Sequence, residues 1–102
     1  MPIASFMIYA GRHQVRVSGG RSYVHIPLKT AGGLLSKKVK VVALVNSDKC
    51  EDKSFHNSII MFSASLVKVG ETFRINLPSY YAEVAARISN CGSLDIWLMP
   101  IG

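Results

Sequence analysis

Apolar and polar residues alternate along most of this chain, in short runs separated by glycine, proline, serine and asparagine. Alternation with a period of two is typical of β-strands that bury one face. Polar turns at residues 18–22 and 70–72 indicate two hairpins. Residues 39–45 are apolar on both faces apart from Lys40, so we expect a central strand there. The first predicted strand covers residues 3–9 and is ended by Gly11. The other predicted strands cover residues 13–17, 23–26, 39–45, 59–62, 66–69, 73–77 and 94–99.

One helix is predicted after the second hairpin. Its apolar residues fall at positions i, i+3, i+4 and i+7, the spacing of a stripe that packs on a sheet. These residues are Tyr81, Val84, Ala85 and Ile88. Ser79 is the expected N-cap, and Gly92 is the expected left-handed residue that ends the helix. Residues 28–36 should form a connection with at most one helical turn, because Gly32 and Gly33 each weaken a helix by about 1 kcal/mol.

The same order of elements occurs twice. Residues 15–17 (VRV), a polar turn and residues 23–27 (YVHIP) return as residues 67–69 (VKV), a polar turn and residues 73–78 (FRINLP). The two prolines that end these segments are 51 residues apart in a chain of 102 residues. Neither half alone buries enough core to be stable, so the halves should pack together. We predict an α+β, mostly β fold in which two pseudo-two-fold-related β-β-β-(α)-β repeats form one domain: repeat one over 1–46, a linker over 47–57 and repeat two over 58–102.

The composition indicates a folded, intracellular protein with a binding partner. Charged residues make up 18% of the chain, below the usual share of about 25%, so a chain of this size has more apolar surface than it can easily bury. The longest uncharged apolar run, residues 41–45, is far shorter than a membrane span, and we expect no membrane association. The net charge of +6 is uneven: residues 1–51 hold eight basic and two acidic residues, whereas residues 52–102 hold four of each.

The first hairpin resembles the AbrB/SpoVT family of swapped-hairpin transcription factors. The resemblance rests on the V-x-V strand at 15–17, the turn at Gly20 and Arg21, and the strand end at 24–27 (VHIP). It covers residues 14–45 and, more loosely, 66–99. It implies a self-contained pseudo-dimer and DNA binding through basic loop residues, here Arg12, Arg16, Arg21 and Lys29. The length and overall run of residues also resemble the small proteins of filamentous viruses that infect hyperthermophilic archaea, which implies a viral protein inside its host.

Catalytic, cofactor and metal-binding signatures find little support, so we expect a protein that is not an enzyme and holds neither a cofactor nor a metal. The three histidines, His13, His25 and His56, are dispersed, and no serine or cysteine beside them forms a nucleophile signature. Cys50 and Cys91 lack paired metal-ligand spacing. The sequence leaves open whether these two cysteines are reduced or form a disulfide.

Two functions remain. The favoured one is an interaction module that binds a protein or peptide, a homodimer included, in the groove between the repeats or along an exposed strand edge. Its candidate residues are Trp97, Met99, Tyr80 and His25, with Trp97 as the first candidate for a surface anchor. The alternative is DNA binding by the basic first repeat, because contacts to phosphates supply much of the affinity for DNA. The residues for this alternative are Arg12, Arg16, Arg21, Lys29, Lys37, Lys38 and Lys40.

Overall fold

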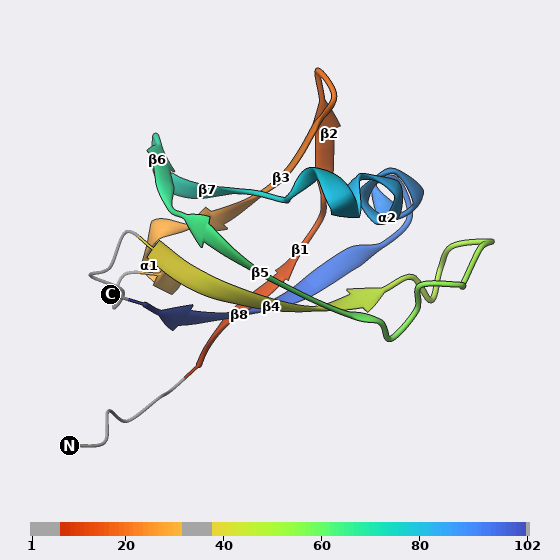
Figure 1. The fold of residues 1–102 in the computed structure, drawn as a ribbon, viewed down its shortest axis with the longest axis horizontal. Coiled ribbons are helices and arrows are strands. Elements are labelled where there is room, and N and C mark those ends of the chain that lie inside the picture. The colour runs from red at the N-terminus through yellow and green to blue at the C-terminus, as the bar shows by residue number, and fades with distance from the viewer. Residues whose placement is uncertain (1–6, 32–37, 102) are drawn as a thin grey trace.

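The computed structural model describes residues 7–31 and 38–101, and within them it has a mostly β, α+β fold (Figure 1). In these residues eight strands form two antiparallel four-stranded sheets, which confirms the mostly β, α+β part of the predicted fold class. Sheet A has the order β1 (Ile8–His13), β8 (Ser93–Pro100), β4 (Lys38–Asn46) and β5 (Ile59–Ser65). Sheet B has the order β2 (Arg16–Ser18), β3 (Arg21–Pro27), β7 (Thr72–Asn76) and β6 (Val67–Val69). The helical segments are α1 (Leu28–Ala31), the 3-10 turn η1 (Ser79–Tyr81) and α2 (Ala82–Ile88).

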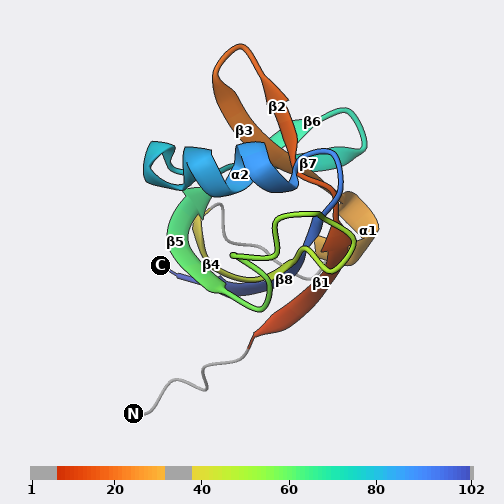
Figure 2. The same cartoon turned by 90° about the vertical axis from the view of Figure 1, so that its right-hand side faces the viewer.

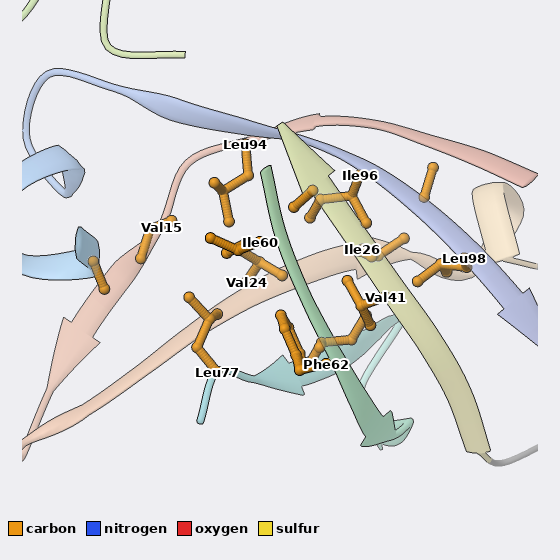
Figure 3. Packing of buried hydrophobic residues seen from close by; sticks show 14 of the residues in the cluster. Val15, Val24, Ile26, Val41, Ile60, Phe62, Leu77, Leu94, Ile96 and Leu98 are labelled. Atoms are coloured by element: carbon orange, nitrogen blue, oxygen red, sulfur yellow. The ribbon is translucent and has the colours of Figure 1, made fainter. Parts of the chain in front are cut away.

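The two sheets and α2 enclose one apolar core. Figure 2 shows sheet A as a curved layer with sheet B and α2 on its concave side. Strand β4 lies in the middle of sheet A, as its continuous apolar run predicted. Alternate residues of each central strand point into the core, and Figure 3 shows several of them interdigitating. The buried set includes Val24 and Ile26 of β3, Val41 of β4, Ile75 of β7, Ala85 and Ile88 of α2, and Leu94, Ile96 and Leu98 of β8.

The first strand of the chain differs from its prediction. Gly11 does not end the strand, because β1 runs from Ile8 to His13 and passes through this glycine. The register against β8 shifts between Tyr9 and Gly11, and Gly11 has a φ of +95°. Glycine therefore marks a β-bulge here, where one extra residue needs a backbone conformation that side chains disfavour. The predicted strand residues 3–6 lie outside the described part of the chain.

The helix of the second half forms, but both predicted ends were wrong. Ser79 is not an N-cap: it begins the 3-10 turn η1, and α2 starts at Ala82 without a side-chain cap. Gly92 is not among the residues with positive φ. Its N–H donates to the carbonyl of Ile88 (2.8 Å), and a Cβ at this position would lie 2.7 Å from the carbonyl oxygen of Asn46. Glycine is needed at residue 92 for a close approach of backbones, which sequence pattern does not distinguish from a cap.

A disulfide joins the polar segment between the halves to the connection that precedes β8. Cys50 and Cys91 are bonded, with 5.2 Å between their Cα atoms, so the question that the sequence left open is answered. Cys50 is buried and Cys91 is exposed. The base of the segment is tied to β4 as well, because the amide of Asn57 donates to the carbonyl of Val45 (2.9 Å). The segment predicted as a linker is thus fixed at both its base and Cys50.

Candidate functional site

The convex side of sheet A carries a row of apolar side chains that crosses all four strands. Tyr9 of β1 lies opposite Trp97 of β8, Trp97 lies opposite Val42 of β4, and Val42 lies opposite Met61 of β5. Residues that are directly opposite in antiparallel strands share a face. Their sequence neighbours, such as Ile96 and Leu98, point into the core, so this row points outward.

Neighbouring residues widen this row into a patch. Leu44 is opposite Ile59, and Met99 is opposite Lys40 at the border of the patch. The exposed fractions are 64% for Ile59, 51% for Tyr9 and 46% for Met61, whereas Trp97 is half-buried. We call this patch the outer apolar face, and it consists of Tyr9, Val42, Leu44, Ile59, Met61, Trp97 and Met99.

An ion pair holds one end of the outer apolar face in place. Arg12 donates from Nε to Oδ1 of Asp95 (3.1 Å) and from Nη2 to Oδ2 (3.2 Å), a bidentate contact. The hydroxyl of Tyr9 also donates to Oδ1 of Asp95 (2.8 Å). The hydrogen bond from Arg12 lowers the pKa of Asp95, and the hydrogen bond to Asp95 raises the pKa of Tyr9. The anchored Tyr9 ring lies 5.1 Å from the Trp97 ring, so the two aromatic groups are oriented before any partner arrives.

Strand β5 at one border of sheet A is blocked at its middle. The amide of Met61 donates to the hydroxyl of Tyr81 (3.2 Å), and that hydroxyl donates to the carbonyl of Met61 (3.1 Å). A side chain therefore occupies backbone groups that an added strand would need. This contact disfavours the predicted peptide-binding mode along an exposed edge at β5, whereas the face beside this edge stays open.

The structure brings together two of the four residues proposed for polypeptide binding. Trp97 and Met99 both lie on the outer apolar face. Tyr80 lies elsewhere, on η1, where it is 71% exposed and its ring is 4.5 Å from that of Tyr81. His25 lies on sheet B, with Nδ1 3.0 Å from Oγ1 of Thr72. The four residues predicted for one polypeptide-binding site therefore do not share a surface, because only Trp97 and Met99 lie on the same face.

A shallow concavity lies where the two halves meet in sheet B. Residues 20–22 of the first half and residues 76–79 of the second half line it, together with Ala82. Leu77 and Pro78 supply its apolar wall, and Arg21 supplies a charge. Other concavities are also lined by both halves, for example one with Arg16 and Tyr23 from the first half and Ser89 and Asn90 from the second.

The seven basic residues of the DNA-binding alternative are spread over several surfaces. Arg12 and Lys40 lie beside the outer apolar face, and Arg12 is engaged by Asp95. Arg16 and Arg21 lie on the β2–β3 hairpin. The remaining residues are Lys29 on α1, Lys38 at the start of β4, and Lys37, which lies outside the described residues.

Several residues of the outer apolar face could not be assigned from the sequence. The sequence predicted that Tyr9 is the last residue of one strand and that Met61 lies in another. It did not predict which strands lie beside these two. Only the strand register puts Tyr9, Val42 and Met61 beside Trp97. The available signal was that the run around Val42 and Leu44 is apolar on both faces, which indicates a strand covered on both sides.

Within residues 7–31 and 38–101, no group of three or more His, Cys, Asp or Glu side chains is placed to hold a metal ion. The helices in the same ranges are too short to cross a membrane. No protein-family model, curated protein or solved structure matches the chain.

Proposed function

We propose that this protein is a non-enzymatic module that binds another polypeptide through the outer apolar face of sheet A. The observation that carries the proposal is the continuous row of Tyr9, Trp97, Val42 and Met61 across four strands. Small proteins rarely leave a contiguous apolar patch of this kind in water unless it contacts a partner. Scattered exposed apolar residues would need no such explanation.

The composition of the face suits a protein interface. Trp, Tyr and Met are enriched at interface centres, and charged residues belong at the rim. Trp97 lies inside the patch, whereas Arg12 and Lys40 lie at its border. Because the Tyr9 and Trp97 rings are already held in place, binding costs less side-chain entropy than it would with free rings.

The charge of the protein favours a partner with an apolar centre and an acidic rim. Within the described residues, Asp95 is the one carboxylate on the strands of sheet A, and it is neutralised by Arg12, which leaves Lys40 to contribute positive charge. The chain as a whole carries +6, so a second copy is repelled while an acidic polypeptide is attracted. A hetero-complex therefore fits the face better than a homodimer.

The strand order supports the idea that two copies of one β-β-β-(α)-β unit build the scaffold. Exchanging β1 with β5, β2 with β6, β3 with β7 and β4 with β8 reverses the strand order of each sheet and leaves it otherwise unchanged. In sheet B, Val24 pairs with Ile75, the residue 51 positions later. A two-fold axis that relates two copies would pass through such a pair. The self-contained pseudo-dimer that the AbrB/SpoVT resemblance implies would have an axis of this kind.

The proposal is tested by selecting peptides from a random library on the immobilised protein and measuring their affinity for variants. Met61→Asp puts a charge into the apolar row, on its edge strand β5. Val69→Asp is the matched control. Val69 and Met61 are each 46% exposed, and each lies on an edge strand, Val69 on β6 of sheet B and Met61 on β5 of sheet A. We expect peptides rich in apolar and acidic residues, whose affinity falls at least about tenfold with Met61→Asp and is unchanged with Val69→Asp.

Two results would contradict the proposal. One is equal binding of the selected peptides to both folded variants. The other is failure to select any peptide from a protein that sedimentation shows to be a dimer, with Met61→Asp giving monomers; the outer apolar face would then be covered by a second copy. Circular dichroism and thermal melting of each variant establish that the substitution has not unfolded the sheet.

A further inference from the structure

The outward side of sheet B has a different chemistry from that of sheet A. Arg16 of β2 is opposite Tyr23 of β3, and Tyr23 is opposite Asn76 of β7. In the next row His25 is opposite Arg74. The alternate residues, including Val24, Ile26 and Ile75, point into the core, so these polar side chains point outward. We call this surface the basic sheet face, and it consists of Arg16, Arg21, Tyr23, His25, Arg74 and Asn76.

The arginines of the protein fall into two groups. Arg12 and Arg87 form ion pairs with carboxylates, Arg12 with Asp95 and Arg87 with Asp52 and Glu83. The described residues contain three further arginines, Arg16, Arg21 and Arg74, for which no carboxylate partner occurs, and all three lie on the basic sheet face. No carboxylate lies on a strand of sheet B within the described ranges, since Glu71 is in the β6–β7 turn. This face therefore gathers uncompensated positive charge from both halves of the chain.

Aromatic groups accompany the charge. The guanidinium of Arg74 lies 3.9 Å from the centre of the Tyr23 ring, and its Nε donates to Oδ1 of Asn76 (3.0 Å). The ring of His25 meets the Tyr23 ring edge to face, with 5.2 Å between centroids. A guanidinium that lies over a ring and donates from Nε still has its terminal N–H groups for a phosphate oxygen, and a guanidinium plane can stack on a base. The arrangement offers charge and stacking at the same place.

We propose that the basic sheet face binds single-stranded nucleic acid. Proteins that bind single strands combine cationic side chains for the phosphates with aromatic or guanidinium planes for the bases. Arg16 and Arg74 are separated by one strand, roughly 9–10 Å between strand axes, so they reach different phosphates. A duplex hides its base faces and is read by an element that enters a groove, whereas this face is an open sheet surface. The proposal is independent of polypeptide binding, because it uses the other sheet.

Fluorescence anisotropy with labelled oligonucleotides tests the proposal. The probes are single-stranded DNA and RNA of about 20 nucleotides, longer than a typical small-domain site, and a duplex of the same length. Over about 50–200 mM salt we expect single strands to bind more tightly than the duplex, with a slope of log K against log salt of about −2 for three phosphate contacts. Arg16→Gln removes one phosphate contact, so the slope should become less negative by about 0.7. Arg74→Lys keeps the charge and removes the planar guanidinium, so it should keep the slope and lower the affinity roughly tenfold.

Lys53→Gln is the control, because it removes one positive charge from an exposed site in the segment between β4 and β5. We expect it to leave the slope and the affinity within about twofold of the unmodified protein. Three outcomes would overturn the proposal: no binding of single strands at about 100 µM protein and low salt, tighter binding of the duplex, or equal losses with Lys53→Gln and Arg16→Gln. The first would mean that the basic sheet face is only a solvated surface, and the second that the ligand is double-stranded.

Discussion

Breaking the Cys50–Cys91 disulfide should lower the stability of the protein by several kilocalories per mole. The bond joins two cysteines that are 41 positions apart in the sequence. Loop-closure entropy in the unfolded chain then predicts a stabilisation of about 4 kcal/mol, before any change in native packing. Because 1 kcal/mol shifts the melting temperature of a domain of this size by about 4–8 °C, the expected loss is roughly 15–30 °C.

The measurement is thermal melting followed by circular dichroism, with and without a thiol-free reductant such as a phosphine. Reduced protein of unchanged sequence is the main comparison, and Cys91→Ala is the second, because Cys91 is exposed and its truncation leaves no cavity. Both should melt at similar temperatures, and adding reductant to Cys91→Ala should change nothing. If fully reduced protein, verified by a free-thiol assay, melts within about 5 °C of the oxidised protein, the loop-closure reasoning is wrong.

Two further predictions concern hydrogen bonds at sheet A. Tyr81→Phe removes the hydroxyl that binds the amide and carbonyl of Met61, so it should lower the free energy of unfolding, measured by urea denaturation, by about 1 kcal/mol. Tyr80→Phe at the neighbouring position should cause no measurable change. Equal effects of the two substitutions would show that the contact at the edge does not stabilise the fold. The lowered pKa of Asp95 means that its ionised form stabilises the fold at pH values above the ordinary 3.8 and that this contribution is lost as the pH falls through the lowered folded-state pKa. The margin in free energy of unfolding between the unmodified protein and Asp95→Asn should therefore be constant above the ordinary value and shrink below it, and a margin that does not change with pH would contradict this.

Local patterns were sufficient to predict most strands, the two hairpins and the face that α2 buries. They failed at residues 13–17, where His13 ends β1 and β2 begins only at Arg16. Alternation located the hairpins, and the stripe from Tyr81 to Ile88 packs against the core as expected. Glycine was the main source of error, because the same residue type permits a bulge at Gly11 and a close backbone approach at Gly92. The sequence pattern carries no information on which of these a glycine serves.

The candidate surfaces needed the pairing of distant strands, which no local pattern contains. Trp97 and Met99 were recognised because they alternate with buried residues of one strand. Their neighbours Tyr9 and Met61 come from strands at opposite ends of the sheet, and pairing them with β8 and β4 requires the register. On sheet B, Arg74 was not in the predicted basic set, since its half of the chain has no net charge; yet it lies opposite His25 of the other half. Net charge by segment therefore concealed a surface that both halves build.

The order of strands in sheet A constrains how the protein can fold as it is synthesised. Strand β8 lies between β1 and β4, and it is the hydrogen-bonded neighbour of both. Until residues 93–100 have been synthesised, β1 has no hydrogen-bonded neighbour within its sheet, and β4 has only β5 beside it. The residues of β1 therefore lack their sheet partner while residues 14–92 are being synthesised. Pairing over such sequence distances is slow, so folding should be a late, concerted event rather than a stepwise one.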